Sequence, residues 1–277
     1  MAKEKISFKN GSRFCYSVKE NNLNDFYDKI IELSTMSDED YLIDLRLDYL
    51  INKKIDVQDI IKCIVKAKKV LTKDFEVDRQ FIATIRNFSN GGNCLINEKK
   101  YLEIVETLYE KPSVDAIDID YDFYESKSTQ IKKIFSGMLS KKKTLIITYT
   151  CRDKILSKDE YDEIFKTLIK TPAYIIRIIT KAFSTEDTEK LMATAREYDG
   201  LLKKNNKVAV VISTGKLGIL SRVWYEYSNT MIIYLDAYEL DMVPQGDINK
   251  KVFDKCRKLI SNLDEFSDLS NGIQDVL

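Results

Sequence analysis

Residues 41–48 read Tyr-Leu-Ile-Asp-Leu-Arg-Leu-Asp, and residues 81–86 read Phe-Ile-Ala-Thr-Ile-Arg. Both runs are short and rich in aliphatic residues, as buried strands are. Between them, Ile60, Ile64 and Ala67 recur at the spacing of one face of a helix. This part of the chain therefore predicts a strand, a helix and a second strand in succession.

The same alternation continues along almost the whole chain of 277 residues, with no linker between units. Eight strands that alternate with helices predict a parallel sheet, and its closure into a single (β/α)8 barrel over residues 1–277 is our prediction. A doubly wound open sheet is the alternative, although no GxGxxG or GxxxxGK[ST] motif supports nucleotide binding there. The predicted strands are Phe14–Val18, Tyr41–Leu47, Phe81–Arg86, Val114–Asp120, Thr144–Thr150, Tyr174–Lys181, Val208–Ser213 and Met231–Asp236.

The front of the chain carries a turn signal. Lys9-Asn10-Gly11-Ser12 stands between the apolar residues Ile6 and Phe8 and the first predicted strand. An Asn-Gly pair flanked in this way predicts a short β-hairpin. We expect that hairpin to close the bottom of the barrel.

Composition excludes several classes of function. The chain has 44 Lys and Arg, 44 Asp and Glu, and no histidine. A Ser-His-Asp triad, a histidine metal site and an imidazole base are therefore excluded. A net charge of zero does not favour nucleic acid or an acidic membrane as the partner.

The cysteines and the apolar runs indicate where in the cell the protein is expected. Five scattered cysteines form no CxxC pair, so neither a disulfide framework nor a zinc site is indicated, and we expect no metal or cofactor. Apolar runs stay below the roughly 18 residues that span a bilayer, and the first residues lack the apolar core of a signal peptide. We expect a cytoplasmic protein.

Charged residues fall inside several predicted strands. Side chains alternate between the two faces of a strand. Asp44, Arg46 and Asp48 therefore share one face of the second predicted strand, and Asp118 and Asp120 share one face of the fourth. The outer face of a barrel strand packs against helices and must be apolar, so these charges point inward. Structural ion pairs, such as Asp48 or Asp118 with Arg46, are one interpretation.

The second interpretation is a ligand site. Arg86 ends the third strand, while Arg177 and Lys181 share a face of the sixth. Because charge from several strands converges near the carboxyl ends, where barrels bind ligands, we expect a pocket there. Its arginines favour an anionic ligand, since a guanidinium matches a carboxylate or phosphate.

These motifs resemble those of the type I 3-dehydroquinate dehydratases. Residues 43–48 resemble the family's E-x-R-x-D motif, and residues 81–86 with Gly91-Gly92 resemble its strand-three arginine and Gly-Gly. Residues 115–120 resemble its D-x-I-D-x-E, and residues 216–222 its G-x-x-S-R type motif. The resemblance covers essentially the whole chain in order and implies a (β/α)8 barrel.

The resemblance also implies a ligand and its contacts. The ligand would be a small anionic molecule like dehydroquinate, a cyclic hydroxylated keto-acid of the shikimate pathway. The arginine matching Arg222 would hold its carboxylate, and Arg46, Arg86 and Asp44 would belong to the binding shell, with Asp44 one methylene shorter than the family's glutamate. The family often forms dimers, so a homodimer is possible.

The residues that the resemblance assigns to catalysis differ here. Arg177 matches the lysine that forms a Schiff base in the family, Thr150 matches its acid–base histidine, and Asn90 matches the partner glutamate. A guanidinium stays protonated and offers no free amine to attack a ketone. The late S-A-P-G-Q loop appears as residues 242–246, with the serine lost and Gln245 only near its expected place.

Three hypotheses about function follow. In the first, the protein binds a dehydroquinate-like ligand and has lost imine catalysis. In the second, it is a dehydratase or related lyase in which Arg177 stabilises an enolate oxygen while Lys181, Tyr149 or Cys151 removes the proton. In the third, it is an interaction protein with a vestigial pocket, which the retained arginines argue against.

Overall fold

Eight parallel strands form the centre of the molecule in the computed structural model, which describes residues 6–37, 39–111, 113–125, 129–238 and 248–261. Their order is β7-β6-β5-β4-β3-β2-β1-β8. Between β7 and β8 the Met231 amide donates to the Ala209 carbonyl at 3.1 Å, which nearly closes the sheet. The strands are β1 Arg13–Val18, β2 Leu42–Arg46, β3 Gln80–Thr84, β4 Ala116–Asp120, β5 Thr144–Cys151, β6 Ile175–Lys181, β7 Val208–Thr214 and β8 Ile232–Asp236.

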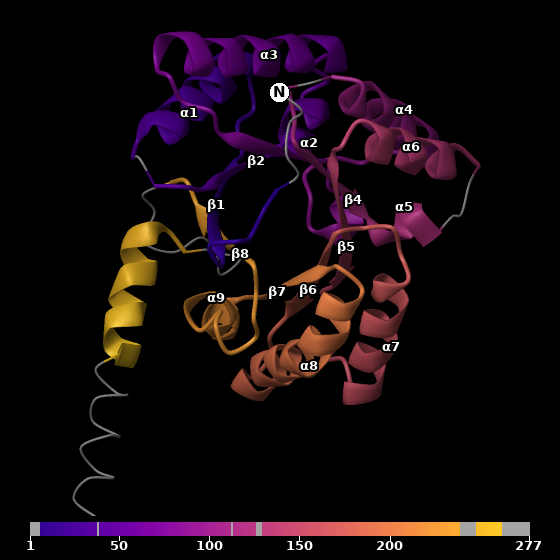
Figure 1. The fold of residues 1–277 in the computed structure, drawn as a ribbon, viewed down its shortest axis with the longest axis vertical. Helices are drawn as coiled ribbons and strands as arrows, with labels where there is room; N and C mark the ends of the chain where they lie inside the picture. The colour runs from indigo at the N-terminus through magenta and orange to yellow at the C-terminus, as the bar shows by residue number, and fades with distance from the viewer. Residues whose placement is uncertain (1–5, 38, 112, 126–128, 239–247, 262–277) are drawn as a thin grey trace, which may run out of the picture.

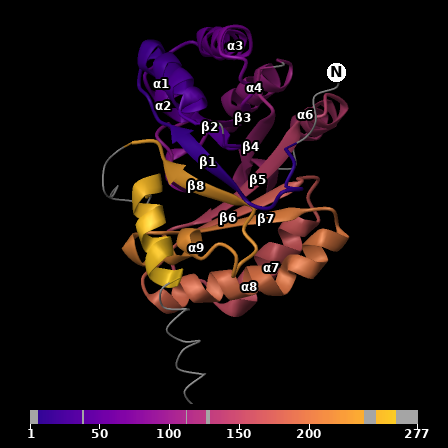
Figure 2. The same ribbon diagram turned by 60° about the vertical axis from the view of Figure 1, so that its left-hand side comes forward.

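Helices surround the strands on the outside (Figures 1 and 2). Side-chain caps set several helix starts; at α7, for example, Ser157 and Glu160 form a capping box. The α-helices are α1 Leu23–Thr35, α2 Leu47–Asn52, α3 Val57–Asp74, α4 Glu98–Tyr109, α5 Tyr121–Glu125, α6 Thr129–Ser140, α7 Lys158–Ile169, α8 Thr185–Lys204 and α9 Leu220–Val223. Two 3-10 helices, η1 Phe88–Asn90 and η2 Lys216–Ile219, and a helical segment at 250–261 complete the described elements.

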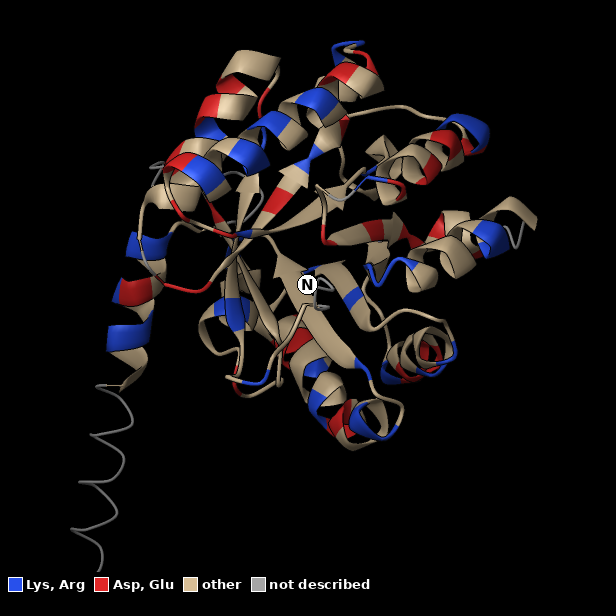
Figure 3. Ribbon diagram, turned by 45° about the horizontal axis from the view of Figure 1, so that its top comes forward, with Lys and Arg blue, Asp and Glu red and all other residues tan. Residues whose placement is uncertain are grey.

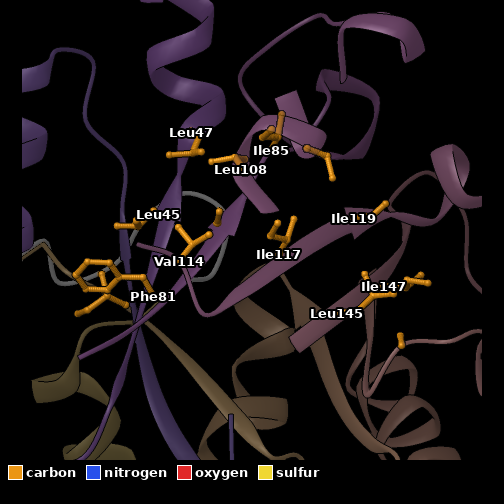
Figure 4. Close-up of a cluster of buried hydrophobic side chains, with 14 of the residues drawn as sticks. Leu45, Leu47, Phe81, Ile85, Leu108, Val114, Ile117, Ile119, Leu145 and Ile147 are labelled. Atoms are coloured by element: carbon orange, nitrogen blue, oxygen red, sulfur yellow. The ribbon is translucent and has the colours of Figure 1, made fainter. Parts of the chain in front are cut away.

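The main hydrophobic core lies between the outer faces of the strands and the helices. Figure 4 shows its β2–β5 part, where Leu45, Ile117 and Ile147 project from the strands toward the helices. These side chains are at most 1% exposed. The outer faces are thus apolar, and the predicted barrel is confirmed.

A second core fills the amino-terminal half of the barrel interior. Eight of its strand residues, one from each strand, are almost fully buried, and we call them the lower inner set. They are Cys15, Leu42, Ile82, Ala116, Ile146, Ile175, Val210 and Ile232.

The segment before β1 packs against this second core. Gly11 adopts a φ of +95°, which glycine tolerates, and its amide donates to the Phe8 carbonyl, so the predicted turn forms. Within residues 6–12, however, no strand pairs with β1, and the predicted hairpin is wrong there. Ile6 instead donates its amide to the Thr144 hydroxyl at 3.0 Å and buries its side chain in the lower end of the barrel.

One strand end differs from its prediction. β2 stops at Arg46, so Asp48 lies in the first turn of α2 and not on the strand face of Asp44. Among the described residues, no helix is long and apolar enough to cross a membrane. The assignment of residues 1–277 to one domain stays a prediction.

Candidate ligand pocket

Two residues beyond each member of the lower inner set, the same face of the strand turns polar in most strands. We call these positions the upper inner set. Figure 3 shows acidic and basic segments within the strands as well as on the helices. The upper inner set comprises Ser17, Asp44, Thr84, Asp118, Thr148, Arg177, Ile212 and Tyr234.

Asp118 is the centre of a buried ion-pair network. Its carboxylate accepts hydrogen bonds from Arg86 at 2.5 Å, from the Thr148 hydroxyl at 2.5 Å, and from Arg177. Arg86 also donates to Asp120 at 2.6 Å. Each of these charged side chains is at most 4% exposed, so the pairing offsets a large desolvation cost.

Arg177 is fixed on three sides. Besides Asp118, its Nε donates to Thr148 at 2.9 Å, and its guanidinium lies 4.7 Å from the centre of the Tyr234 ring. Burial acts to lower the pKa of Arg177, but Asp118, Tyr234 and Asp44 together outweigh it, so that the pKa lies above its ordinary value. The guanidinium is therefore held in its charged form.

Two other carboxylates complete the interior. Asp48 forms a two-pronged pair with Arg46, at 2.9 and 2.8 Å, which confirms the ion pair expected between these residues. Asp44 accepts hydrogen bonds from the hydroxyls of Thr84 and Ser17 at 2.5 and 3.3 Å. Burial raises the pKa of Asp44, although Arg177 and Arg46 act against the shift.

A pocket with a volume of about 80 Å³ opens above this network, at the carboxyl ends of the strands. Its wall carries six basic side chains and a single carboxylate, that of Asp44. An anion fits such a wall better than a cation. The lining residues are Ser17, Lys19, Asp44, Arg46, Arg86, Asn90, Gly91, Arg152, Arg177, Ile179, Ile212, Thr214, Arg222, Tyr234 and Leu235.

The four arginines expected at the site, Arg46, Arg86, Arg177 and Arg222, all line this one pocket. Arg222 reaches it from α9 and donates to the Ser213 carbonyl at 3.0 Å. The fifth expected shell residue, Asp44, lines the pocket as well. The structure therefore brings together the predicted shell, apart from Gln245, which lies outside the described residues.

Asn90 and Thr150 lie close to the network. The Asn90 amide donates to Asp120 and Asp122, both at 3.1 Å. The Thr150 hydroxyl accepts from Arg86 at 3.4 Å. Both side chains thus support the aspartate and arginine array, and neither offers a basic nitrogen for proton transfer.

The residues proposed to remove a proton in the second hypothesis do not line the pocket. Tyr149 and Cys151 alternate with the inward-facing Thr148 and Thr150, and they pack in the outer core. Burial also raises the pKa of the Cys151 thiol, which disfavours a thiolate. Lys181 is exposed, 4.9 Å from the centre of the Phe183 ring, and lies outside the pocket lining.

Among the pocket residues not anticipated from the sequence, two basic residues and a tyrosine stand out. Lys19 and Arg152 lie just beyond the ends of β1 and β5, and Tyr234 lies within the apolar run of β8. Lys19 pairs with Asp236 at 3.2 Å. The sequence signal that could have identified Lys19 and Arg152 is the position of a basic residue directly after a strand. Among the described residues, no cluster of His, Cys, Asp or Glu has the geometry of a metal site.

Comparison with known families decides the identity of the fold. The family model of the type I 3-dehydroquinases matches residues 14–247, most of the chain. The chain belongs to the type I 3-dehydroquinase family.

Individual type I 3-dehydroquinases are distant in sequence. A catabolic 3-dehydroquinate dehydratase of Acinetobacter baylyi is 24% identical over 225 residues, which cover 76% of this chain and 79% of the relative. A 3-dehydroquinate dehydratase of Streptococcus pyogenes is 26% identical over 186 residues, 66% of this chain and 76% of the relative.

Solved structures of type I 3-dehydroquinases share the barrel. The enzyme of Clostridium difficile aligns with a TM-score of 0.78 at 18% identity, over 94% of this chain and 98% of that one. The 3-dehydroquinate dehydratase of Geobacillus kaustophilus aligns with a TM-score of 0.76 at 14% identity, over 91% of each chain. At these identities the alignments support the fold, and function has to be argued from the pocket.

Proposed function

We propose that this member of the type I 3-dehydroquinase family binds a small hydroxylated carboxylate related to dehydroquinate and does not dehydrate it through an imine. One observation carries the proposal. Arg177, which matches the family's Schiff-base lysine, is buried with its guanidinium paired to Asp118, and it has no neutral amine to attack a ketone.

The pocket supports the binding half of the proposal. Four arginines from four separate segments of the chain converge on one cavity of about 80 Å³. Aspartates form ion pairs with Arg46, Arg86 and Arg177. These pairs offset the desolvation cost of keeping the three guanidinium charges in a buried wall. A ligand carboxylate facing this wall gains charge-assisted hydrogen bonds.

The loss of imine chemistry rests on several residues together. The chain has no histidine, and Thr150 occupies the position matched to the acid–base histidine. Among the described residues, Lys19 is the lysine that lines the pocket, and its amine is paired with Asp236 at 3.2 Å. General acid–base catalysis typically contributes about 10²–10⁴-fold, so its loss together with the imine should remove most turnover.

The test separates binding from turnover. Purified protein is titrated with dehydroquinate by calorimetry, turnover is followed by enone absorbance, and the mixture is treated with borohydride before intact-mass analysis. We expect measurable binding, turnover reduced by several orders of magnitude relative to an active family member, and no covalent adduct. An adduct mapped to Lys19 or Lys181, or rapid turnover, contradicts the proposal.

Restoring the missing groups tests the same point from the other side. In the double variant Arg177→Lys with Thr150→His, an amine and an imidazole occupy the two matched positions. We expect borohydride trapping to become detectable, whereas the control Arg196→Lys on the exposed face of α8 stays unreactive. Cytoplasmic location, a homodimer and a place in the shikimate pathway stay predictions.

A further inference from the structure

Arg152 differs from the other arginines of the pocket. It follows β5 directly, lines the pocket and is partly buried. Aspartates hold Arg46, Arg86 and Arg177, but in the described part of the chain no hydrogen bond or ion pair holds the Arg152 guanidinium. Its donors are therefore available to a ligand.

The side chain of Arg152 is nevertheless held in place by packing. It lies across Gly91, where a Cβ atom would stand 2.0 Å from Nη1, 3.0 Å from Cζ and 3.3 Å from Cδ of Arg152. Gly91 also has a φ of +78°, which other residues rarely adopt. The loop after β3 thus provides a bare stretch of backbone on which the guanidinium rests.

Arg152 and Arg222 approach the pocket from opposite sides. Gly91, beneath Arg152, belongs to the loop after β3, and Arg222 is bound to the carbonyl of Ser213 in β7. β3 and β7 are four strands apart in the order of eight, so they face each other across the barrel. A small ligand between them meets one guanidinium at each end.

This geometry points to a ligand with two acidic groups, one at Arg222 and the second at Arg152. The inference rests on the proposed anion pocket and narrows its ligand class to small hydroxylated diacids, whose second acid is a carboxylate or a phosphate ester. A ligand with a single carboxylate leaves Arg152 without a charged partner. A guanidinium bound to an acid forms the stronger, charge-assisted kind of hydrogen bond.

Three matched probes test the second acid. They share a six-membered ring and one carboxylate: 4-hydroxycyclohexanecarboxylate, cyclohexane-1,4-dicarboxylate and 4-phosphonooxycyclohexanecarboxylate. Dissociation constants are measured by calorimetry at constant ionic strength. We expect at least one of the two diacids to bind about tenfold or more tightly than the monoacid, and the better of the two identifies the second acid.

Variants assign the effect to Arg152. Arg152→Gln should reduce the ratio of monoacid to diacid dissociation constants to about one, and Arg152→Lys should restore part of it. The control Arg196→Gln makes the same charge change on the exposed face of α8 and should leave the ratio unchanged. Circular dichroism confirms that each variant is folded.

The outcomes distinguish the inference from the proposed function. If the wild type binds the monoacid as tightly as both diacids, or if Arg152→Gln leaves the ratio unchanged, Arg152 is a solvated rim residue and the inference is wrong. If the wild type binds none of the three probes and no dehydroquinate, the anion pocket itself is wrong, and the inference falls with it.

Discussion

The two halves of the barrel interior use the same strand faces for opposite chemistry. The lower inner set is almost entirely apolar, with Ile82, Ile146 and Ile175 fully buried. The upper inner set, two residues further along each strand, includes Asp44, Asp118 and Arg177. One step of two residues thus separates a dry core from a charged wall.

The difference shows that depth along the strand, and not the face alone, determines what an inward residue can be. The lower end is covered by Ile6, so ions there would have neither water nor a ligand. The upper end opens into the pocket, where water or a ligand can reach the paired ions. The apolar half should therefore contribute to stability alone, whereas the charged half should contribute both to stability, through its paired ions, and to the proposed binding.

The largest effect is expected at Asp118, on which the charged half depends. Asp118→Asn removes the carboxylate that Arg86 and Arg177 share and leaves excess buried positive charge. We expect a loss of about 3–5 kcal/mol in the free energy of unfolding, measured by urea denaturation. Adding Arg177→Gln to this variant should recover part of the loss, because one uncompensated charge is removed.

The matched control is Asp74→Asn at the exposed end of α3, where we expect a change within about 0.5 kcal/mol. An Asp118→Asn protein as stable as the control would mean that the buried network contributes nothing to the fold.

The apolar half is tested by Ile146→Ala, which opens a cavity in the lower inner set. Ile146 is 0% exposed, and we expect destabilisation of about 3 kcal/mol, with unchanged affinity for ligands in the folded protein. Urea denaturation and calorimetric titration measure the two properties separately. A large loss of affinity would show that the two halves are coupled, against the comparison above.

The helices lie outside both halves of the barrel interior. A single helix cap there shows how much one local interaction contributes to the free energy of unfolding. Ser157→Ala removes the hydroxyl that caps the Glu160 amide at the start of α7. Loss of such a cap should cost about 1 kcal/mol and leave ligand affinity unchanged. Thermal denaturation measures the difference. The control is Ser136→Ala, which removes an exposed hydroxyl within α6 that does not cap a helix start.

The smallest effect is expected in the pH dependence that Asp44 contributes. Burial raises the folded-state pKa of Asp44 above its ordinary value of 3.8, so the folded protein retains this proton to higher pH than the unfolded chain. As pH rises above 3.8, the stability of the wild type should fall relative to Asp44→Asn, which cannot titrate. Urea denaturation of both proteins across a pH series measures this difference. A wild-type stability that rises with pH relative to that of Asp44→Asn contradicts the prediction.

Much of the fold was predictable because strand patterns are local. All eight strands occur where aliphatic runs were found, and the outward apolar faces placed Asp44 and Arg177 inside the barrel. The strand-like residues before Gly11 are an exception, since a turn alone does not supply a partner strand. Ile6 gains more by filling the end of the barrel than by pairing with β1.

The site was less predictable where the alternation of faces stops. Lys19 and Arg152 lie beyond strand ends, where no rule of alternation assigns a direction. Tyr149 and Cys151 were placed at the pocket although their spacing from Thr150 puts them on the outer face. Which carboxylate pairs with Arg86 depended on contacts between strands that no local pattern encodes.

The nearly closed junction between β7 and β8 is where we expect the strands of the barrel to separate most readily. There, the Met231 amide bonds to Ala209, and the Thr230 hydroxyl accepts from the Val211 amide at 3.3 Å, in place of a strand ladder. Two pocket residues lie beside this junction: Arg222 in α9, which follows β7, and Tyr234 within β8. Amides along it should exchange with solvent sooner than those between β5 and β6. A small widening there should change the distance between Arg222 and Tyr234, and with it the contact of Arg177 with the Tyr234 ring.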